Sequence, residues 1–207
     1  MAFSIPDDLA PEVYPLAWLL GTWRGEGVLA YPGIEETPIV QTVVVDHDGG
    51  PYLRYTSTIR TNDVVVPDTV PDDLPDDLRD HPSDDLSDRQ DGARAAAKPD
   101  DELPIWSTET GYWRVPPERP EDLPADRFPV EVLLSDPAGH LALYLGAVGN
   151  GRIDLASDLI ARTPSAAAVN AATRMYGLVE GRLLWVWEIA AFGHPLQSYV
   201  SASLDRQ

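Results

Sequence analysis

The sequence predicts an all-β protein, a ten-stranded antiparallel up-and-down β-barrel with a short helical cap at its N-terminus. Ten runs rich in β-branched and aromatic residues follow one another, separated by turns that contain Gly, Pro or Asn. Residues 11–20 instead form an apolar helical or turn segment that we expect to plug the barrel. A meander of this many strands is best closed on itself, because closure removes exposed edges. The predicted strands are Leu20–Tyr31, Ile39–Asp46, Tyr52–Arg60, Ile105–Val115, Phe128–Leu134, His140–Val148, Arg152–Ile160, Ala167–Val179, Arg182–Ala191 and Leu196–Leu204.

The glycine-rich start of the first predicted strand organises the rest of the barrel. Its alternate positions are Gly21, Trp23, Gly25 and Gly27. Residues two apart share a face of a strand, so this face carries little besides one indole. Because glycine weakens a strand, its repeated use here indicates a close backbone approach where the barrel wall curves inward. We expect Trp23 to fill the end of the barrel that the glycines leave open. A bent edge strand is the alternative interpretation. Residues 25–30 also fit a loose glycine pattern for dinucleotide binding, but that pattern requires a helix directly after it, and Pro32 stops such a helix.

Length and composition set bounds on the class of protein. The 207 residues suffice for one domain with a sizeable core, which we expect to span 1–207. No cysteine is present, so disulfides and thiolate metal sites are excluded. The net charge of −19 opposes binding to nucleic acid or an anionic membrane, and no apolar run is long enough to span a membrane. The N-terminus lacks a secretory pattern, so we expect a cytoplasmic protein.

An acidic segment separates the third predicted strand from the fourth. Between residues 61 and 104, fourteen acidic side chains accompany only four basic ones, with six prolines among them. Such a segment buries too little apolar surface to offset its ordering entropy, so we expect a solvated insertion at about 62–104. It lacks the spacing of a calcium loop, and we interpret it as a solvated charge run rather than a metal site. Recruitment of a basic partner by this segment is a further hypothesis.

Two motifs and the end of the chain resemble the nitrobindins. The first motif is Leu-Gly-Thr-Trp-Arg-Gly-Glu-Gly at 20–27, followed by Tyr31 and Pro32, and the second is Glu-Thr-Gly-Tyr-Trp-Arg at 109–114. The likeness runs from about Pro15 to the C-terminus, interrupted by the acidic segment. It implies a ten-stranded barrel related in shape to lipocalins and fatty-acid-binding proteins. It also implies a haem at the barrel mouth, nitric oxide bound at the iron, peroxynitrite chemistry, and a homodimer as a further option.

The sequence departs from the nitrobindin pattern at the residue that would hold the iron. There the resemblance places a histidine a few residues after a Pro-Leu pair; carried onto Pro195 and Leu196, that position is Tyr199. Gly33 stands where the pattern has a threonine close to the haem. His194 lies near the site but has the opposite strand parity to Tyr199. All four histidines fall in predicted turns or loops, namely His47, His81, His140 and His194.

Tyr199 itself has two interpretations. A tyrosinate binds ferric haem in some proteins, but the ordinary phenol pKa of about 10 calls for a neighbouring cation. By strand parity its neighbours on the same face are Gln197, Ser201 and Ser203, none of which is charged. We therefore favour a neutral phenol that points into a pocket and is hydrogen-bonded there.

These observations predict a binding barrel rather than an enzyme. We expect no cofactor, no metal site and no catalytic residue; a small hydrophobic ligand would lie in an interior cavity, with Tyr199, Gly33 and Trp23 as pocket candidates. The alternative is a haem b protein that handles nitric oxide or peroxynitrite through Tyr199 or His194. The remaining acidic candidates are interpreted as wall or rim charges, namely Asp154, Asp158 and Glu188. Trp185 and Trp187 are interpreted as core or pocket lining.

Overall fold

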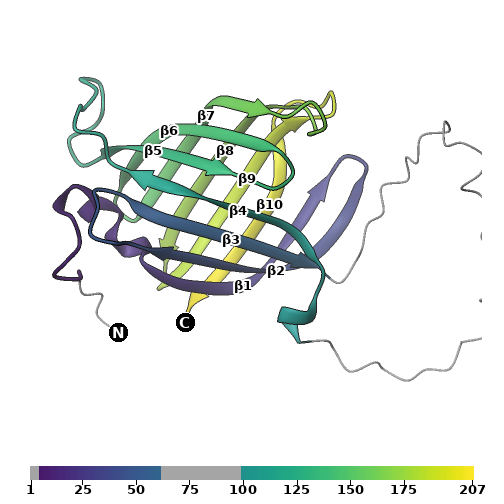
Figure 1. Ribbon diagram of the computed structural model, residues 1–207, viewed down its shortest axis with the longest axis horizontal. Helices are drawn as coiled ribbons and strands as arrows, with labels where there is room; N and C mark the ends of the chain where they lie inside the picture. The colour runs from purple at the N-terminus through teal and green to yellow at the C-terminus, as the bar shows by residue number, and fades with distance from the viewer. Residues whose placement is uncertain (1–4, 62–98) are drawn as a thin grey trace, which may run out of the picture.

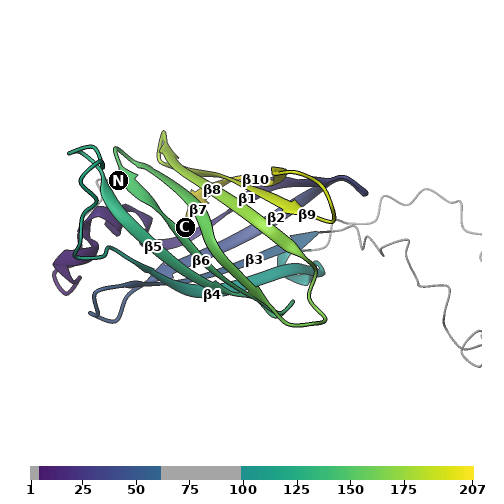
Figure 2. The same ribbon diagram turned by 90° about the horizontal axis from the view of Figure 1, so that it is seen from above.

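Ten antiparallel strands close into a barrel in the computed structural model, which describes residues 5–61 and 99–207. Each strand pairs with its neighbours in sequence, and β1 closes the barrel against β10 (Figures 1 and 2). Within the described residues, the short 3-10 helices η1 and η3 precede β1 and β4. The elements are η1 (Pro11–Leu19), β1 (Gly21–Tyr31), β2 (Ile34–Asp46), β3 (Leu53–Thr61), η3 (Asp100–Glu102), β4 (Ile105–Arg114), β5 (Phe128–Ser135), β6 (His140–Gly149), β7 (Arg152–Arg162), β8 (Val169–Val179), β9 (Arg182–Ala191) and β10 (Gln197–Arg206).

The predicted fold class, a ten-stranded antiparallel barrel with a short helical cap, is confirmed. The largest boundary error is at β2, which begins at Ile34 rather than Ile39, while several other strand ends differ by one or two residues. The chain reverses directly after β1, at Gly33, whose φ of 86° suits glycine. The polar residues that follow lack the alternation of a half-buried strand, yet they pair with β1, as Pro38 does with Val28. The result is a long hairpin that projects beside the rest of the sheet (Figure 1).

The helix η1 closes one end of the barrel, and the tip of the β1–β2 hairpin lies at the other end in both views (Figures 1 and 2). Trp23 is fully buried at the closed end, and its Nε1 donates to the carbonyl of Leu19 at 2.7 Å. The guanidinium of Arg206 lies 4.2 Å above the Trp23 ring and donates to the carbonyls of Trp18 and Leu20. This end is therefore held by backbone carbonyls that belong to η1 and the residue after it.

The glycines of β1 allow its backbone to lie very close to β10. A Cβ placed on Gly25 would sit 2.2 Å from the carbonyl oxygen of Ser203, and one on Gly27 would sit 2.3 Å from that of Ser201. Both contacts are with backbone, which has no room to move aside. The alternation of glycines in the sequence thus has its physical reason in a close approach of two strands.

Among the described residues, no helix is long and apolar enough to cross a membrane. The expected insertion at 62–104 lies outside the described residues up to position 98. From 99 onward the chain re-enters through η3, where Arg24 on β1 donates to the carboxylate of Asp101 at 3.1 Å. This ion pair ties the segment before β4 to the wall of the barrel.

Candidate functional site

Tyr199 lies at the open end of the barrel, on an irregular part of β10. The ladder between β10 and β9 passes from Ser198 directly to Val200, so Tyr199 is an extra residue in a β-bulge. Its ring packs edge-on against Trp187, with the ring centroids 5.0 Å apart. The bulge therefore turns the phenol toward the interior side of the wall.

This bulge overturns the same-face neighbours that strand parity assigned to Tyr199. Strict alternation groups it with Gln197, Ser201 and Ser203, but an extra residue shifts parity along the strand. Ser201 and Ser203 lie instead along a hollow on the outer wall. The groups around Tyr199 are aromatic side chains from three other strands.

We call Tyr31, Trp106, Trp187 and Tyr199 the mouth cluster. The indole Nε1 of Trp106 donates to the hydroxyl of Tyr199 at 2.9 Å. Tyr31 meets Tyr199 at 90° with centroids 5.9 Å apart. Trp106 also occupies a bulge, because the β3–β4 ladder skips it between Ser107 and Ile105. Two bulges thus aim two side chains of distant strands at each other.

The surroundings of Tyr199 act on its acidity in opposite directions. Burial raises the pKa of the phenol above its ordinary value, because the charged form loses its hydration. The hydrogen bond from Trp106 lowers the pKa, because an N–H donor stabilises the phenolate, but burial prevails. The phenol is therefore neutral near pH 7.

Deeper in the barrel lies a buried ion pair between Arg174 on β8 and Glu109 on β4. The two are joined by a bidentate contact, with Nη1 to Oε1 at 2.6 Å and Nη2 to Oε2 at 2.7 Å. The hydroxyl of Tyr55 adds a third hydrogen bond to Glu109 at 3.1 Å. Burial by itself lowers the pKa of Arg174, but the Glu109 carboxylate raises it well above its ordinary value. The guanidinium also lies 4.3 Å from the ring of Trp187, which connects the pair to the mouth cluster.

Several buried polar atoms in this interior have no hydrogen-bond partner within the described part of the chain. Leaving a buried donor unpaired costs about 1–3 kcal/mol. The indole N–H of Trp187 is such a donor at the mouth, and it is available to an acceptor on a bound molecule. The interior set comprises Trp113 Nε1, Arg174 Nε, Tyr176 Oη and Trp187 Nε1.

The structure does not bring the three predicted pocket residues together. Trp23 pairs with Arg206 near the end of β10, whereas Leu29, six residues further along β1, pairs with Val200. At ~3.3 Å per residue this places Trp23 about 20 Å from the level of Tyr199. Gly33 occupies the exposed turn between β1 and β2. Of the three, Tyr199 alone faces the mouth.

The histidines of the described residues lie on turns and at the rim. His194 is exposed and presents its ring edge to Tyr31 at 6.0 Å. His140 contacts the carboxylate of Asp136 and the carbonyl of Ala167 through its two ring nitrogens. His47 lies 3.9 Å from Asp8. His81 lies outside the described residues.

The remaining candidates lie in the wall or the core. Asp154 accepts hydrogen bonds from Arg127 and Arg152, and Glu188 accepts one from Thr173. Trp185 and Trp187 stack with centroids 6.5 Å apart, and Trp185 donates to Gln41 at 2.6 Å. No pairing of carboxylates for acid–base chemistry results among these residues.

Three residues of the interior site escaped the sequence analysis: Trp106, Glu109 and Arg174. On β4, Glu109 lies on the same inward face as Gly111 and Trp113. On β8, Arg174 lies on the same inward face as Tyr176. A charge at an inward position signals a partner, because an isolated buried charge is costly. The sequence contains this signal on both strands, but only the fold joins positions 65 residues apart.

The fold and the mouth define the class of protein: it is a closed ten-stranded barrel with one plugged end and one open end. Residues 12–206 match the family described as "THAP4-like, heme-binding beta-barrel domain". A "Ferric nitrobindin-like protein" of Beutenbergia cavernae is 46% identical, over 100% of this chain and 99% of that protein. A "Peroxynitrite isomerase" of Clavibacter sepedonicus is 40% identical over 98% of each chain. The solved structure of Rv2717c from M. tuberculosis superposes with a TM-score of 0.67 at 28% identity, covering 96% of this chain and 99% of that one.

This chain belongs to the THAP4-like, nitrobindin family of haem-binding β-barrels. The resemblance noted in the sequence is thereby confirmed. The expectation that no cofactor is involved is wrong, because the family that matches nearly the whole chain is a haem-binding one. A missing imidazole does not by itself exclude haem, because other side chains also ligate haem iron.

The residues at the mouth fit a haem in their chemistry. A phenol oxygen is a known axial ligand of haem iron, and Tyr199 places one among aromatic rings. The hydrogen bond from Trp106 stabilises the anionic form that a metal binds, against the larger effect of burial, which raises the pKa of the phenol. The unpaired N–H of Trp187 adds a donor for an acceptor on the bound group.

Proposed function

We propose that this protein binds haem at the barrel mouth and that Tyr199 faces the iron, at the position where the nitrobindin pattern places a histidine. The observation that carries this proposal is the bulge in β10, which turns the Tyr199 phenol inward against Trp106 and Trp187. Bound haem would supply a redox-active iron. The chain's own residues would bind and orient it: Tyr199 as the oxygen donor, Trp106 as the donor that holds that oxygen, and Tyr31 and Trp187 as apolar walls.

The proposed function is binding, not catalysis. Peroxynitrite isomerase is the name of relatives that are about 40% identical to this chain. The identity of the axial ligand is one of the features that set the reactivity of haem iron. Because Tyr199 stands where the nitrobindin pattern places an imidazole, the main reason to assign peroxynitrite isomerase activity to this chain is removed. Peroxynitrite decay should be no faster with the hemin-loaded protein than with an equal amount of free hemin.

A titration with hemin tests the iron contact, and iron-free protoporphyrin IX tests the pocket. We expect hemin to bind the native chain, Tyr199→Phe to weaken hemin binding, and Tyr199→His to restore it. Protoporphyrin IX should bind native and Tyr199→Phe protein alike, because it presents no metal to the phenol. Tyr112→Phe is the control, since this tyrosine is exposed on the outer side of β4. Equal hemin affinity of native and Tyr199→Phe protein would contradict the role of Tyr199, and no binding of either porphyrin would contradict the haem site.

The second candidate is a small hydrophobic ligand held in the barrel without iron. The raised pKa of Tyr199 favours it, because a neutral phenol suits an apolar ligand better than a metal. Native mass spectrometry of the freshly purified protein separates the two candidates by the mass of what co-purifies. A haem mass supports the first candidate and a lipid or other apolar compound supports the second.

A further inference from the structure

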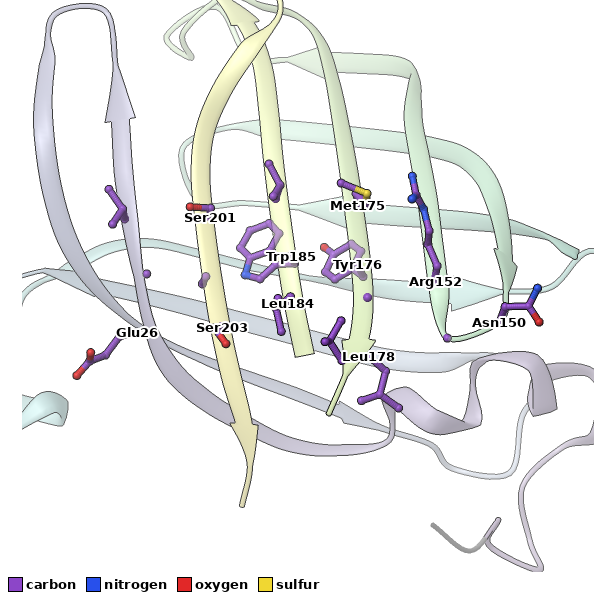
Figure 3. Close-up of a pocket in the computed structure, with 17 residues that line it drawn as sticks. Glu26, Asn150, Arg152, Met175, Tyr176, Leu178, Leu184, Trp185, Ser201 and Ser203 are labelled. Carbon is purple, nitrogen blue, oxygen red and sulfur yellow. The ribbon is translucent and has the colours of Figure 1, made fainter. Parts of the chain in front are cut away.

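The strands β7 and β8 pair over only part of their length. The ladder between them covers residues 152–156 of β7 and 173–177 of β8. Figure 3 shows this paired part beside the hollow of the outer wall, with Arg152 on one strand and Tyr176 on the other. Nearer the mouth the two strands leave the ladder. We call residues 157–162 of β7 and 169–172 of β8 the seam.

The seam is held by a side chain instead of a backbone ladder. The amide of Ala172 donates to the hydroxyl oxygen of Ser157 at 2.9 Å. Each strand also has an extra residue here, Asp158 on β7 and Asn170 on β8, which does not match its other neighbouring strand. Such bulges are frequent at the rims of barrels, where they end the regular pairing. The seam is therefore a weakly paired part of the barrel wall.

The loop that joins β7 to β8, residues 163–168, is fixed at its start by contacts that do not depend on pH near neutrality. The amide of Thr163 donates to the carbonyl of Gly139, on the turn between β5 and β6, at 2.9 Å. The guanidinium of Arg162 donates to the carbonyl of Ala166 at 3.0 Å. Backbone amides and guanidinium groups keep their protons in this range, so these anchors persist.

The end of the loop is held by His140, the first residue of β6, which has an acceptor at each ring nitrogen. Nδ1 lies 3.1 Å from the carboxylate of Asp136, and Nε2 lies 2.9 Å from the carbonyl oxygen of Ala167. An imidazolium donates to both oxygens, whereas a neutral imidazole has a single N–H and donates to only one. The carboxylate is the stronger acceptor, so the neutral ring loses its bond to Ala167.

The charged groups beside His140 have opposite effects on its charged form. The carboxylate of Asp136 favours the imidazolium through direct contact. Arg162 is the partner of His140 in the β6–β7 ladder and opposes it, but its guanidinium is bound to the carbonyl of Ala166. Residues 163–168 include no titratable side chain. Since histidine is the side chain that ordinarily changes charge between about pH 5 and 8, the contact with Ala167 depends on pH near neutrality.

The end of the loop leads directly to the mouth cluster. Two residues after Ala167, Val169 begins β8 and pairs with Ala191 at the end of β9. The amide of Ala191 donates to the hydroxyl of Tyr31 at 2.9 Å. Because Tyr31 belongs to the mouth cluster, a movement of Ala167 acts on the wall of the mouth.

We propose that His140 is a pH-dependent latch of the barrel mouth. As an imidazolium it joins Asp136 to Ala167 and holds the end of the loop, which keeps the seam closed. As a neutral imidazole it releases Ala167 while the anchors at Thr163 and Ala166 persist, so the seam opens beside the mouth. The interior thus becomes more accessible as the pH rises. The latch is a property of the unliganded chain and is independent of what the mouth binds.

Amide hydrogen exchange of the unliganded chain, measured by NMR at about pH 6 and about pH 8.5 and corrected for the intrinsic effect of pH, tests the latch. We expect the Ala172 amide to exchange at least about tenfold faster at the higher pH, because a hydrogen bond from a charged donor is lost. The Thr163 amide should show no such change, because its acceptor is the backbone carbonyl of Gly139.

Two variants should abolish this pH dependence in opposite ways. His140→Leu has no donor for Ala167, so the Ala172 amide should exchange fast at both pH values. In Asp136→Asn the amide nitrogen can donate to Nδ1 of a neutral ring, whose Nε2–H then still donates to Ala167. The Ala172 amide should therefore stay protected at both pH values. A merely structural role of His140 would not produce this protection at high pH.

His47→Leu is the matched control. Its side chain is 14% exposed, as is that of His140, and it also lies beside a carboxylate, 3.9 Å from Asp8, but in a different turn. This variant should keep the pH dependence of the native chain. Equal protection of Ala172 at both pH values in the native chain, or a native pH dependence in Asp136→Asn, would overturn the proposal. Both results remain decisive if His140→Leu does not fold.

Discussion

The two ends of the barrel use the same kinds of side chain in different ways. At the closed end the indole of Trp23 donates to a backbone carbonyl four residues earlier, and the guanidinium of Arg206 covers its ring. At the mouth the indole of Trp106 donates to a side chain 93 residues later, and the indole of Trp187 has no partner among the described residues. At the closed end the polar side chains are therefore hydrogen-bonded to nearby backbone carbonyls, whereas at the mouth an indole N–H has no hydrogen-bond partner among the described residues.

This difference separates stability from binding. A backbone carbonyl in η1 is held by the chain around it, so the closed end is fixed once the barrel forms. A hydroxyl at a bulge and an unpaired N–H are free to exchange their partners for atoms of a ligand. Substitutions at the closed end should thus reduce the free energy of unfolding, and those at the mouth should act mainly on binding.

The largest effect is expected from Trp23→Ala. The side chain is fully buried, and its removal leaves a cavity beneath η1 in addition to the lost hydrogen bond to Leu19. We expect a loss of about 3–5 kcal/mol in the free energy of unfolding, measured by urea denaturation. A loss below 1 kcal/mol would show that the closed end is not a centre of stability.

Denaturation at alkaline pH compares the deeply buried phenol of Tyr176 with the phenol of Tyr199 at the mouth. Burial raises the pKa of Tyr176 from 10.0 to about 12. The folded state holds this proton more tightly, so the stabilisation is complete below pH 10 and is lost as the pH rises toward 12; two pKa units correspond to about 3 kcal/mol. Denaturation curves across this range should show less loss in Tyr176→Phe than in the native chain. Tyr199→Phe should relieve the loss in the same direction, because burial raises that pKa as well.

An intermediate effect is expected from Trp106→Phe. The change removes the hydrogen bond to Tyr199 but keeps an aromatic ring at the bulge. We expect a loss of only about 1 kcal/mol in the free energy of unfolding. Hemin affinity should fall more clearly, because the phenolate loses its donor, and a titration monitored by absorbance measures it. Unchanged hemin affinity with lowered stability would assign Trp106 a purely structural role.

The smallest effect on stability is expected from Trp187→Phe. Its N–H has no partner within the described residues, so the substitution breaks no hydrogen bond there, and removing an unpaired buried donor offsets part of the packing lost with the smaller ring. We expect the free energy of unfolding to change by less than about 1 kcal/mol. The control is Trp185→Phe, which breaks the bond to Gln41 and leaves the oxygen of that amide unpaired, at a cost of about 1–3 kcal/mol. Thermal or chemical denaturation compares the two variants. Equal losses would mean that Trp187 also has a partner in the unliganded protein.

Much of the fold follows from local features of the chain. The alternation of glycines around Trp23 predicted a close strand contact, and the structure has Gly25 and Gly27 against the backbone of β10. The turn residues between strands predicted a meander, and each strand pairs with its sequence neighbours. Both features depend on residues within a few positions of one another, which is why single-sequence patterns contain them.

The site is less predictable, because it depends on pairing across strands. Nothing local marks the extra residue in β10, since a bulge is defined by the partner strand that it fails to match. Without the bulge, parity places Tyr199 beside Ser201 and Ser203 on the outer side. The Arg174–Glu109 pair likewise depends on β8 and β4 facing each other across the barrel.

The sequence by itself determined the barrel, its closed end and the position of Tyr199 on the last strand, because periodicity, glycine spacing and turn residues act over short distances. The tertiary structure decided which side chains Tyr199 contacts and where a hollow opens on the outer wall. Those properties arise from strand register, and register is fixed only when all ten strands pair at once.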